Sequence, residues 1–271
     1  MPQIVPLTFE DYGAAIGAAA TVLRANATSS GLTVAVPTCP GWTVADLVVH
    51  QGMVHRWAAD VLAGVQGDGS DHAAAGRAAA DLLDWFDDGA TALLDTLSKT
   101  PADWTGWFFL RTDGPVRDGW ARRQAHETTI HAVDAMGARL GRVPTAPELW
   151  FTRDLALDGI DELLTGFAPR RSTRLRAPEP TTIEITTDAA AWTVQLGEDP
   201  PQVCRGTAAD HGIAADATWS ASASDLYLAL WNRVDRSGPD EGADRIHIES
   251  RTDAGARARG LWTDLFTVEW A

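Results

Sequence analysis

Four long segments with helical character fill the first half of the chain, and short connections join them. They span residues 7–26, 43–64, 71–99 and 116–139. Thr8 suits the N-cap of the first segment. Thr43 suits that of the second, where Asp46 stands three positions later in a variant of the capping box. Four helices of this length with short connections favour a helix bundle.

The stretch GRVPTAP, residues 141–147, interrupts this pattern with two prolines and a glycine. Beyond it the pattern changes. Helical segments at 147–167, 223–233 and 253–266 accompany alternating, β-branched segments at 181–187, 191–197 and 245–250. We therefore predict an α+β chain, with a four-helix bundle in residues 1–143 and a smaller α+β domain in residues 144–271.

Composition excludes several classes of function. The net charge of −15 opposes binding to a phosphate backbone, so we expect no nucleic-acid partner. The N-terminus lacks the basic and apolar regions of a signal peptide, and no apolar run is long enough to span a membrane. We expect a cytoplasmic protein in which Cys39 and Cys204 form no structural disulfide.

The segment HETTIHAVDA, residues 126–135, lies in the fourth helical segment and is close to the HExxH zinc motif. Its histidines, His126 and His131, are five residues apart and diverge by about 140° around a helix, so they cannot share a metal. Glu127 and His131, at i and i+4, share one face with Arg123 and Asp134. On this helix alone, a solvated polar face is the favoured interpretation.

His50 adds a third candidate ligand. It shares the apolar face of the second helical segment, which should point into the bundle. A lone histidine there is usually a hydrogen-bonded core residue. If the second and fourth helices face each other, however, His50, Glu127 and His131 converge. Two imidazoles and one carboxylate suit a catalytic zinc, and equally non-haem ferrous iron. His55 lies about 140° from His50 and is not a natural co-ligand.

Two motifs in this order, VPTCPGWTVADLVVHQ and RRQAHETTIHAVDA, resemble the mycothiol-dependent maleylpyruvate isomerase family of the DinB-like metalloenzymes. The segment WSASASDLYLALWNR is similar to the family's C-terminal signature. The resemblance implies a DinB-like four-helix bundle before a smaller α+β domain, and a zinc bound by His50, Glu127 and His131. It also implies an arginine near the site, best matched by Arg233, although Asn232 stands where the family more usually has glycine.

This resemblance implies an enzyme that uses zinc, or another divalent metal such as iron or nickel, with mycothiol as the thiol cosubstrate. The reaction would be cis–trans isomerisation of a maleylpyruvate-like substrate, or thiol transfer to an electrophilic small molecule. Arg233, and less directly Arg123, would hold a substrate carboxylate. A zinc-dependent hydrolase and a non-catalytic ligand-binding or regulatory protein are the alternatives.

Several further residues carry expectations. Asp134 is predicted to be a surface charge rather than a group that orients a ligand, and Cys39 a structural thiol. His126 is expected to point away from the metal. Four aromatic residues before the fourth helix are expected to line an apolar pocket or to pack between the domains: Trp104, Trp107, Phe108 and Phe109.

Overall fold

A computed structural model describes residues 5–234 and 245–266 of the chain. The backbone contacts divide it into two compact units, and the division falls between Phe151 and Thr152. The boundary expected between residues 143 and 144 stays a prediction. The fold class, α+β with helices first and a sheet in the C-terminal part, is confirmed.

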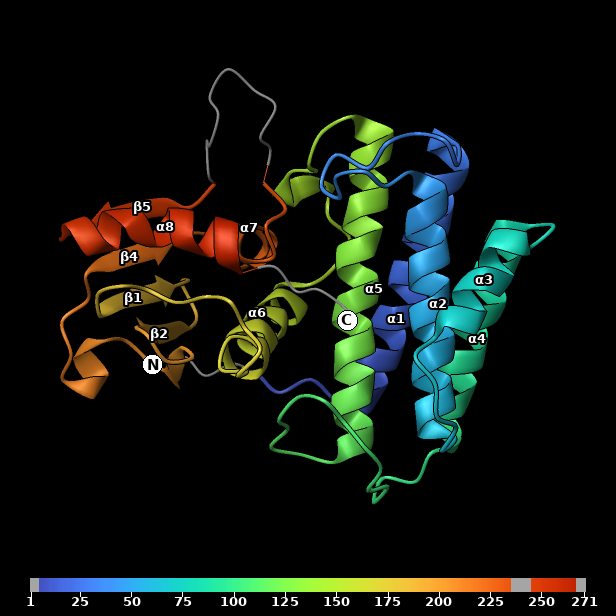
Figure 1. Ribbon diagram of the computed structural model, residues 1–271, viewed down its shortest axis with the longest axis horizontal. Coiled ribbons are helices and arrows are strands. Elements are labelled where there is room, and N and C mark those ends of the chain that lie inside the picture. Colours follow the sequence, from blue (N-terminus) through green and yellow to red (C-terminus); the bar gives the residue numbers. More distant parts are fainter. Residues whose placement is uncertain (1–4, 235–244, 267–271) are drawn as a thin grey trace. The chain divides into compact units, whose positions relative to one another are not determined.

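Four long helices form the N-terminal unit: α1 (Phe9–Ser30), α2 (Val44–Leu62), α4 (Leu82–Lys99) and α5 (Val116–Leu140). Helices α1 and α2 each pack against both α4 and α5, so the contacts form a closed ring of four helices. Figure 1 shows these helices side by side. A short helix, α3 (Ser70–Ala78), packs on α2 and α4. In this ring α2 lies directly beside α5. The predicted convergence of His50 with Glu127 and His131 depends on this contact.

The prediction of one continuous helix over residues 71–99 is wrong. The chain leaves the helical conformation after Ala78, and Asp81 is extended, with φ −126° and ψ 109°. Its carboxylate accepts hydrogen bonds from the backbone N–H groups of Leu83 and Asp84, both at 3.0 Å. Asp81 thus caps a new helix, and this capping replaces continuation of α3.

The predicted caps of the first two helices are confirmed. Thr8 with Asp11, and Thr43 with Asp46, each form a reciprocal capping box. The second box begins α2 at Val44 and therefore fixes where His50 stands along the helix.

Helix α5 is buried on nearly all sides. Small side chains such as Ala121, Ala125, Ala132 and Ala135 lie at its contacts with the other helices and have no exposed surface. Because alanine lets neighbouring backbones approach closely, polar residues on the remaining faces of α5 are also enclosed.

The C-terminal unit begins with α6 (Arg153–Asp161), which continues as a π-helical turn, η2 (Glu162–Phe167). The predicted helix over residues 147–167 is therefore wrong at its start. A 3₁₀ turn, η1 (Ala146–Glu148), comes first, and Thr152 caps α6 by accepting from the Leu155 N–H at 3.2 Å. The remaining elements are β1 (Thr181–Thr186), β2 (Ala191–Leu196), β3 (Gln202–Arg205), η3 (Ala209–His211), β4 (Ala217–Ser220), α7 (Ala223–Leu230), β5 (His247–Ser250) and α8 (Asp253–Leu265).

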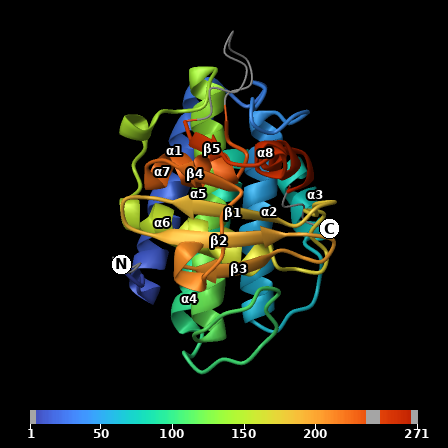
Figure 2. The ribbon, with the colours of Figure 1, turned by 90° about the vertical axis from the view of Figure 1, so that its left-hand side faces the viewer.

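The five strands form one sheet in the order β3-β2-β1-β4-β5 (Figure 2). Strands β1 and β4 are parallel, and the other neighbouring pairs are antiparallel. Strands β1, β2 and β5 match the predicted segments, whereas β3 and β4 were not predicted. Each of these two has only four residues, too few for an alternating pattern to stand out.

Among the described residues, no helix has the length and apolar character that crossing a membrane requires. The structure describes Cys39 and Cys204 as thiols, not joined to each other in a disulfide.

Candidate metal centre

His50 from α2 and Glu127 and His131 from α5 meet in the N-terminal unit. Their donor atoms all lie within 4.8 Å of one another. Glu127 Oε1 is 3.4 Å from His50 Nε2 and 3.3 Å from His131 Nε2. The structure thus brings together the three residues predicted from the sequence, and their role as metal ligands stays a prediction.

The indole ring of Trp42 packs beside the two histidines. Its ring centroid lies 5.0 Å from that of His50 and 6.2 Å from that of His131, with which it is nearly parallel. The two imidazoles are 4.9 Å apart, edge to face. Trp42 was not predicted as a site residue. It lies in the motif VPTCPGWTVADLVVHQ, eight residues before His50.

Arg123 lies one helical turn before Glu127 and has no exposed surface. Its Nη2 donates to Glu127 Oε2 at 3.1 Å, whereas Oε1 faces the two imidazoles. The two oxygens of Glu127 are therefore divided between the guanidinium and the histidines. This contact favours a positioning role for Arg123, and its predicted contact with a substrate carboxylate stays a prediction.

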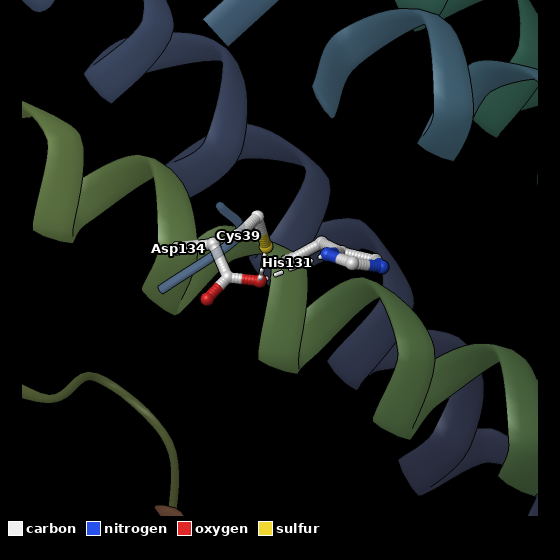
Figure 3. A group of neighbouring side chains, drawn as sticks. All are labelled: Cys39, His131 and Asp134. Atoms are coloured by element: carbon white, nitrogen blue, oxygen red, sulfur yellow. Dashed lines mark hydrogen bonds and ion pairs between the residues drawn. The ribbon is translucent and has the colours of Figure 1, made fainter. Parts of the chain in front are cut away.

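Asp134 holds the opposite side of the His131 ring. Its Oδ2 accepts from His131 Nδ1 at 2.9 Å and from Cys39 Sγ at 3.4 Å (Figure 3). Its Oδ1 accepts from Thr38 Oγ1 at 2.6 Å. Since the contact with Oδ2 engages Nδ1 of His131, Nε2 is the ring nitrogen that faces Glu127 and is left to bind a metal. Cys39, His131 and Asp134 also form a second group of potential metal donors within 4.8 Å.

The prediction that Asp134 is a surface charge is wrong, because its side chain is fully buried. The solvated-face interpretation is also wrong, since Arg123, Glu127 and His131 are buried as well. The cause is tertiary. The segment with Thr38 and Cys39, which precedes α2, supplies the partners of Asp134.

The electrostatics of the site are strongly coupled. Burial alone would raise the pKa of Glu127, but hydrogen bonds with His131 and His50 and the charge of Arg123 hold it well below 4.5. Burial likewise opposes protonation of His131, yet hydrogen bonds with Asp134, Cys39 and Glu127 raise its pKa well above 6.5. Burial prevails at His50 and lowers its pKa.

The other histidines lie outside this group. His126 is buried but belongs to neither donor group found among the described residues. His55 is hydrogen-bonded to Thr128. His72 contacts Asp60 at 2.7 Å, and His211 contacts the Arg205 carbonyl at 3.0 Å.

Arg233 belongs to the C-terminal unit, just after α7. Its Nη1 donates to the Trp231 carbonyl at 2.8 Å, and the preceding Asn232 has a positive φ of 59°. Glycine adopts this left-handed conformation more readily than asparagine does. The role of Arg233 toward the metal centre stays a prediction.

The aromatic residues before α5 pack within the N-terminal unit. Trp104, Phe108 and Phe109 join a core cluster that includes Trp57 and Trp120. Trp107 accepts from Trp120 Nε1 through its carbonyl at 3.0 Å, and its side chain is 59% exposed. The predicted apolar pocket for a substrate stays a prediction.

Models of known protein families match both parts of the chain. A family model described as the mycothiol maleylpyruvate isomerase N-terminal domain matches residues 14–136. A second, described as the MDMPI C-terminal domain, matches residues 154–253. A comparison with curated proteins gives no match.

Two solved structures share the fold. One is a crystal structure of the mycothiol-dependent maleylpyruvate isomerase, with a TM-score of 0.59 and 14% identity over 92% of this chain and 96% of that one. The other is a histidine-to-alanine mutant of a mycothiol-dependent maleylpyruvate isomerase, with a TM-score of 0.60 and 13% identity over the same shares. Since the two family models together span most of the chain, it belongs to the mycothiol-dependent maleylpyruvate isomerase family.

Proposed function

We propose that the protein is a zinc-dependent enzyme that uses mycothiol to isomerise a maleylpyruvate-like substrate, or to transfer the thiol to an electrophilic small molecule. In the isomerisation, the thiol adds to the cis double bond conjugated with a carbonyl. The resulting single bond rotates, and elimination of the thiol gives the trans isomer. The convergence of His50, Glu127 and His131 carries the proposal, and family membership supports it.

The three residues fit a divalent metal. His131 donates its Nδ1 proton to Asp134, and Arg123 occupies Glu127 Oε2. Two imidazole nitrogens and one carboxylate oxygen therefore face one another, and these contacts fix the side chains of Glu127 and His131. Such a set suits a catalytic zinc with one position left for a ligand. Ferrous iron and nickel accept the same donors, and zinc is our choice for this site.

A divalent metal held there would supply the positive charge that keeps a bound thiol in its thiolate form. The chain's own residues prepare the site for it. Arg123 keeps the Glu127 carboxylate ionised and fixes its orientation, and Asp134 fixes the tautomer of His131. Trp42 limits the access of water on the side where it packs against both histidines.

The metal content of purified protein tests the site. We expect about one zinc per chain in the wild type and in His72→Ala, a matched control at a partly exposed histidine. We expect little or none in His50→Ala and Glu127→Ala. A wild-type protein that is fully stable without any metal would contradict the proposal.

The reaction class is tested by supplying mycothiol and a cis substrate of the maleylpyruvate type. We expect turnover only when the thiol is present. Turnover without thiol would instead show activation of water, as in a hydrolase. Metal binding without turnover under either condition would favour a ligand-binding protein. The absence of nucleic-acid and membrane partners, and a cytoplasmic location, stay predictions from the sequence.

A further inference from the structure

Three buried polar side chains form a cluster between α2 and α5 that the proposed chemistry does not use. His55 Nε2 lies 2.9 Å from Thr128 Oγ1, and Gln51 Nε2 donates to the same oxygen at 3.1 Å. Gln51 Nε2 and His55 Nε2 are 2.8 Å apart. None of the three side chains has exposed surface. We call Gln51, His55 and Thr128 the polar junction.

The hydrogen bonds of Thr128 connect α5 to α2. Thr128 donates its hydroxyl proton to the carbonyl of Gln124 in its own helix, at 2.7 Å. Its oxygen is then an acceptor for donors on α2, and Gln51 supplies one. The side chain of Thr128 is thus tied on one side to α5 and on the other to α2.

The junction lies beside the candidate ligands in both helices. Gln51 directly follows His50, and Thr128 directly follows Glu127. Because the ligands come from two helices, the gap between His50 Nε2 and Glu127 Oε1, 3.4 Å, depends on how α2 lies against α5. Hydrogen bonds one residue away constrain that placement.

Stability alone does not explain these polar residues. Gln51 Oε1 and His55 Nδ1 are buried and have no hydrogen-bond partner among the residues that the structure describes. Burial also lowers the pKa of His55 to about 3, so its imidazole is neutral. Apolar side chains of similar volume would avoid these desolvation costs. Buried polar contacts are best established as devices that fix the register of neighbouring helices.

We propose that the polar junction positions α2 on α5 so that His50 faces Glu127 and His131 before a metal binds. The three are positioning residues that act through the ligands, and this inference rests on the metal centre proposed above. A bundle without the junction would have to reorganise on binding, which weakens the affinity for the metal.

The test replaces the Thr128 hydroxyl while keeping the shape of the side chain. We expect Thr128→Val to bind Zn²⁺ about 10-fold more weakly than the wild type, measured by competition with a chelator, because loss of supporting contacts commonly costs that much. Two controls should stay within about twofold. Thr128→Ser keeps the hydroxyl. Thr129→Val makes the same change at the next residue, which is also fully buried and whose hydroxyl has no hydrogen-bond partner within the described part of the chain.

The absorption of Co²⁺ bound at the site supplies a second measurement, since its visible bands depend on coordination geometry. We expect an altered spectrum in Thr128→Val and wild-type spectra in both controls. If Thr128→Val does not fold, Gln51→Met, which removes the donor on α2, is measured in its place with the same expectation.

The outcomes separate the two proposals. Wild-type affinity in Thr128→Val, or in Gln51→Met where that variant replaces it, overturns the positioning role. So does equal weakening in Thr128→Val and Thr129→Val, which would show a general disturbance of the core. A wild-type protein that binds no Zn²⁺ overturns the metal centre itself.

Discussion

Arg123, Glu127, His131 and Asp134 place four ionisable side chains along one buried face of α5. Isolated charges there would be very costly, since burial removes their hydration. They are tolerated because each has a partner. Arg123 bonds Glu127 at 3.1 Å, and His131 bonds Asp134 at 2.9 Å. Positive and negative groups therefore alternate along this face, and the candidate donor atoms of Glu127 and His131 lie among them.

The pH dependence of stability should reveal the neutral His55. Burial, opposed in part by the charge of Glu127, lowers its pKa from 6.5 to about 3. Between these values the unfolded chain takes up a proton that the folded protein does not, so stability falls as the pH falls. From pH 6.5 to about pH 4.5, the wild type should lose about 2 kcal/mol more than His55→Gln.

Urea unfolding of both proteins in the presence of a chelator measures this difference without interference from bound metal. Equal pH dependence in the two proteins would show that His55 is protonated as easily in the folded state as in the unfolded state.

The candidate ligands could be predicted because their signals are local. The i,i+4 spacing of Glu127 and His131, and the place of His50 on an apolar helix face, depend on one helix at a time. Their surroundings depend on the tertiary structure. The segment with Thr38 and Cys39 reaches Asp134 across 96 and 95 residues of sequence. No helical pattern contains that contact, so the burial of Asp134 was missed.

At the scale of elements, the long helices were predicted better than the short interruptions between them. The long helices α1, α2 and α5 follow their periodic segments to within a few residues. The break between α3 and α4 depends on one capping side chain, Asp81, inside a segment that otherwise has uniform helical character. A local competition of this kind is invisible to a pattern averaged over many residues.

The capping role of Asp81 is testable by itself. Asp81→Ala removes the acceptor of two backbone N–H groups and should lower the free energy of unfolding by about 1 kcal/mol. Asp81→Asn keeps an acceptor and should remain close to the wild type. Urea denaturation compares the three proteins. An alanine variant as stable as the asparagine variant would show that the cap contributes nothing.

At the scale of the whole molecule, the net charge of −15 is the dominant electrostatic feature. Charge of one sign destabilises a folded chain by self-repulsion, and salt screens that repulsion. The buried ion pairs of α5 are screened much less, because ions in solution cannot approach them. Surface repulsion and the internal site should therefore respond differently to salt.

Raising NaCl from about 20 to about 200 mM, which shortens the Debye length roughly threefold, should raise the melting temperature of the metal-free protein by a few degrees. KCl should act equally, since screening does not depend on the identity of the cation. Scanning calorimetry in both salts measures the change. A melting temperature that stays constant or falls would mean that attractive surface pairs outweigh the net repulsion.

The position of His50 and Glu127, 77 residues apart in the chain, has a mechanical consequence. An ion bound by both side chains would close a loop that contains the whole of α3 and α4. A force applied at the two ends of the chain would then be borne by the metal–ligand bonds, and the loop would stay unextended until one of them broke. The site would thereby set the order in which the bundle comes apart under tension.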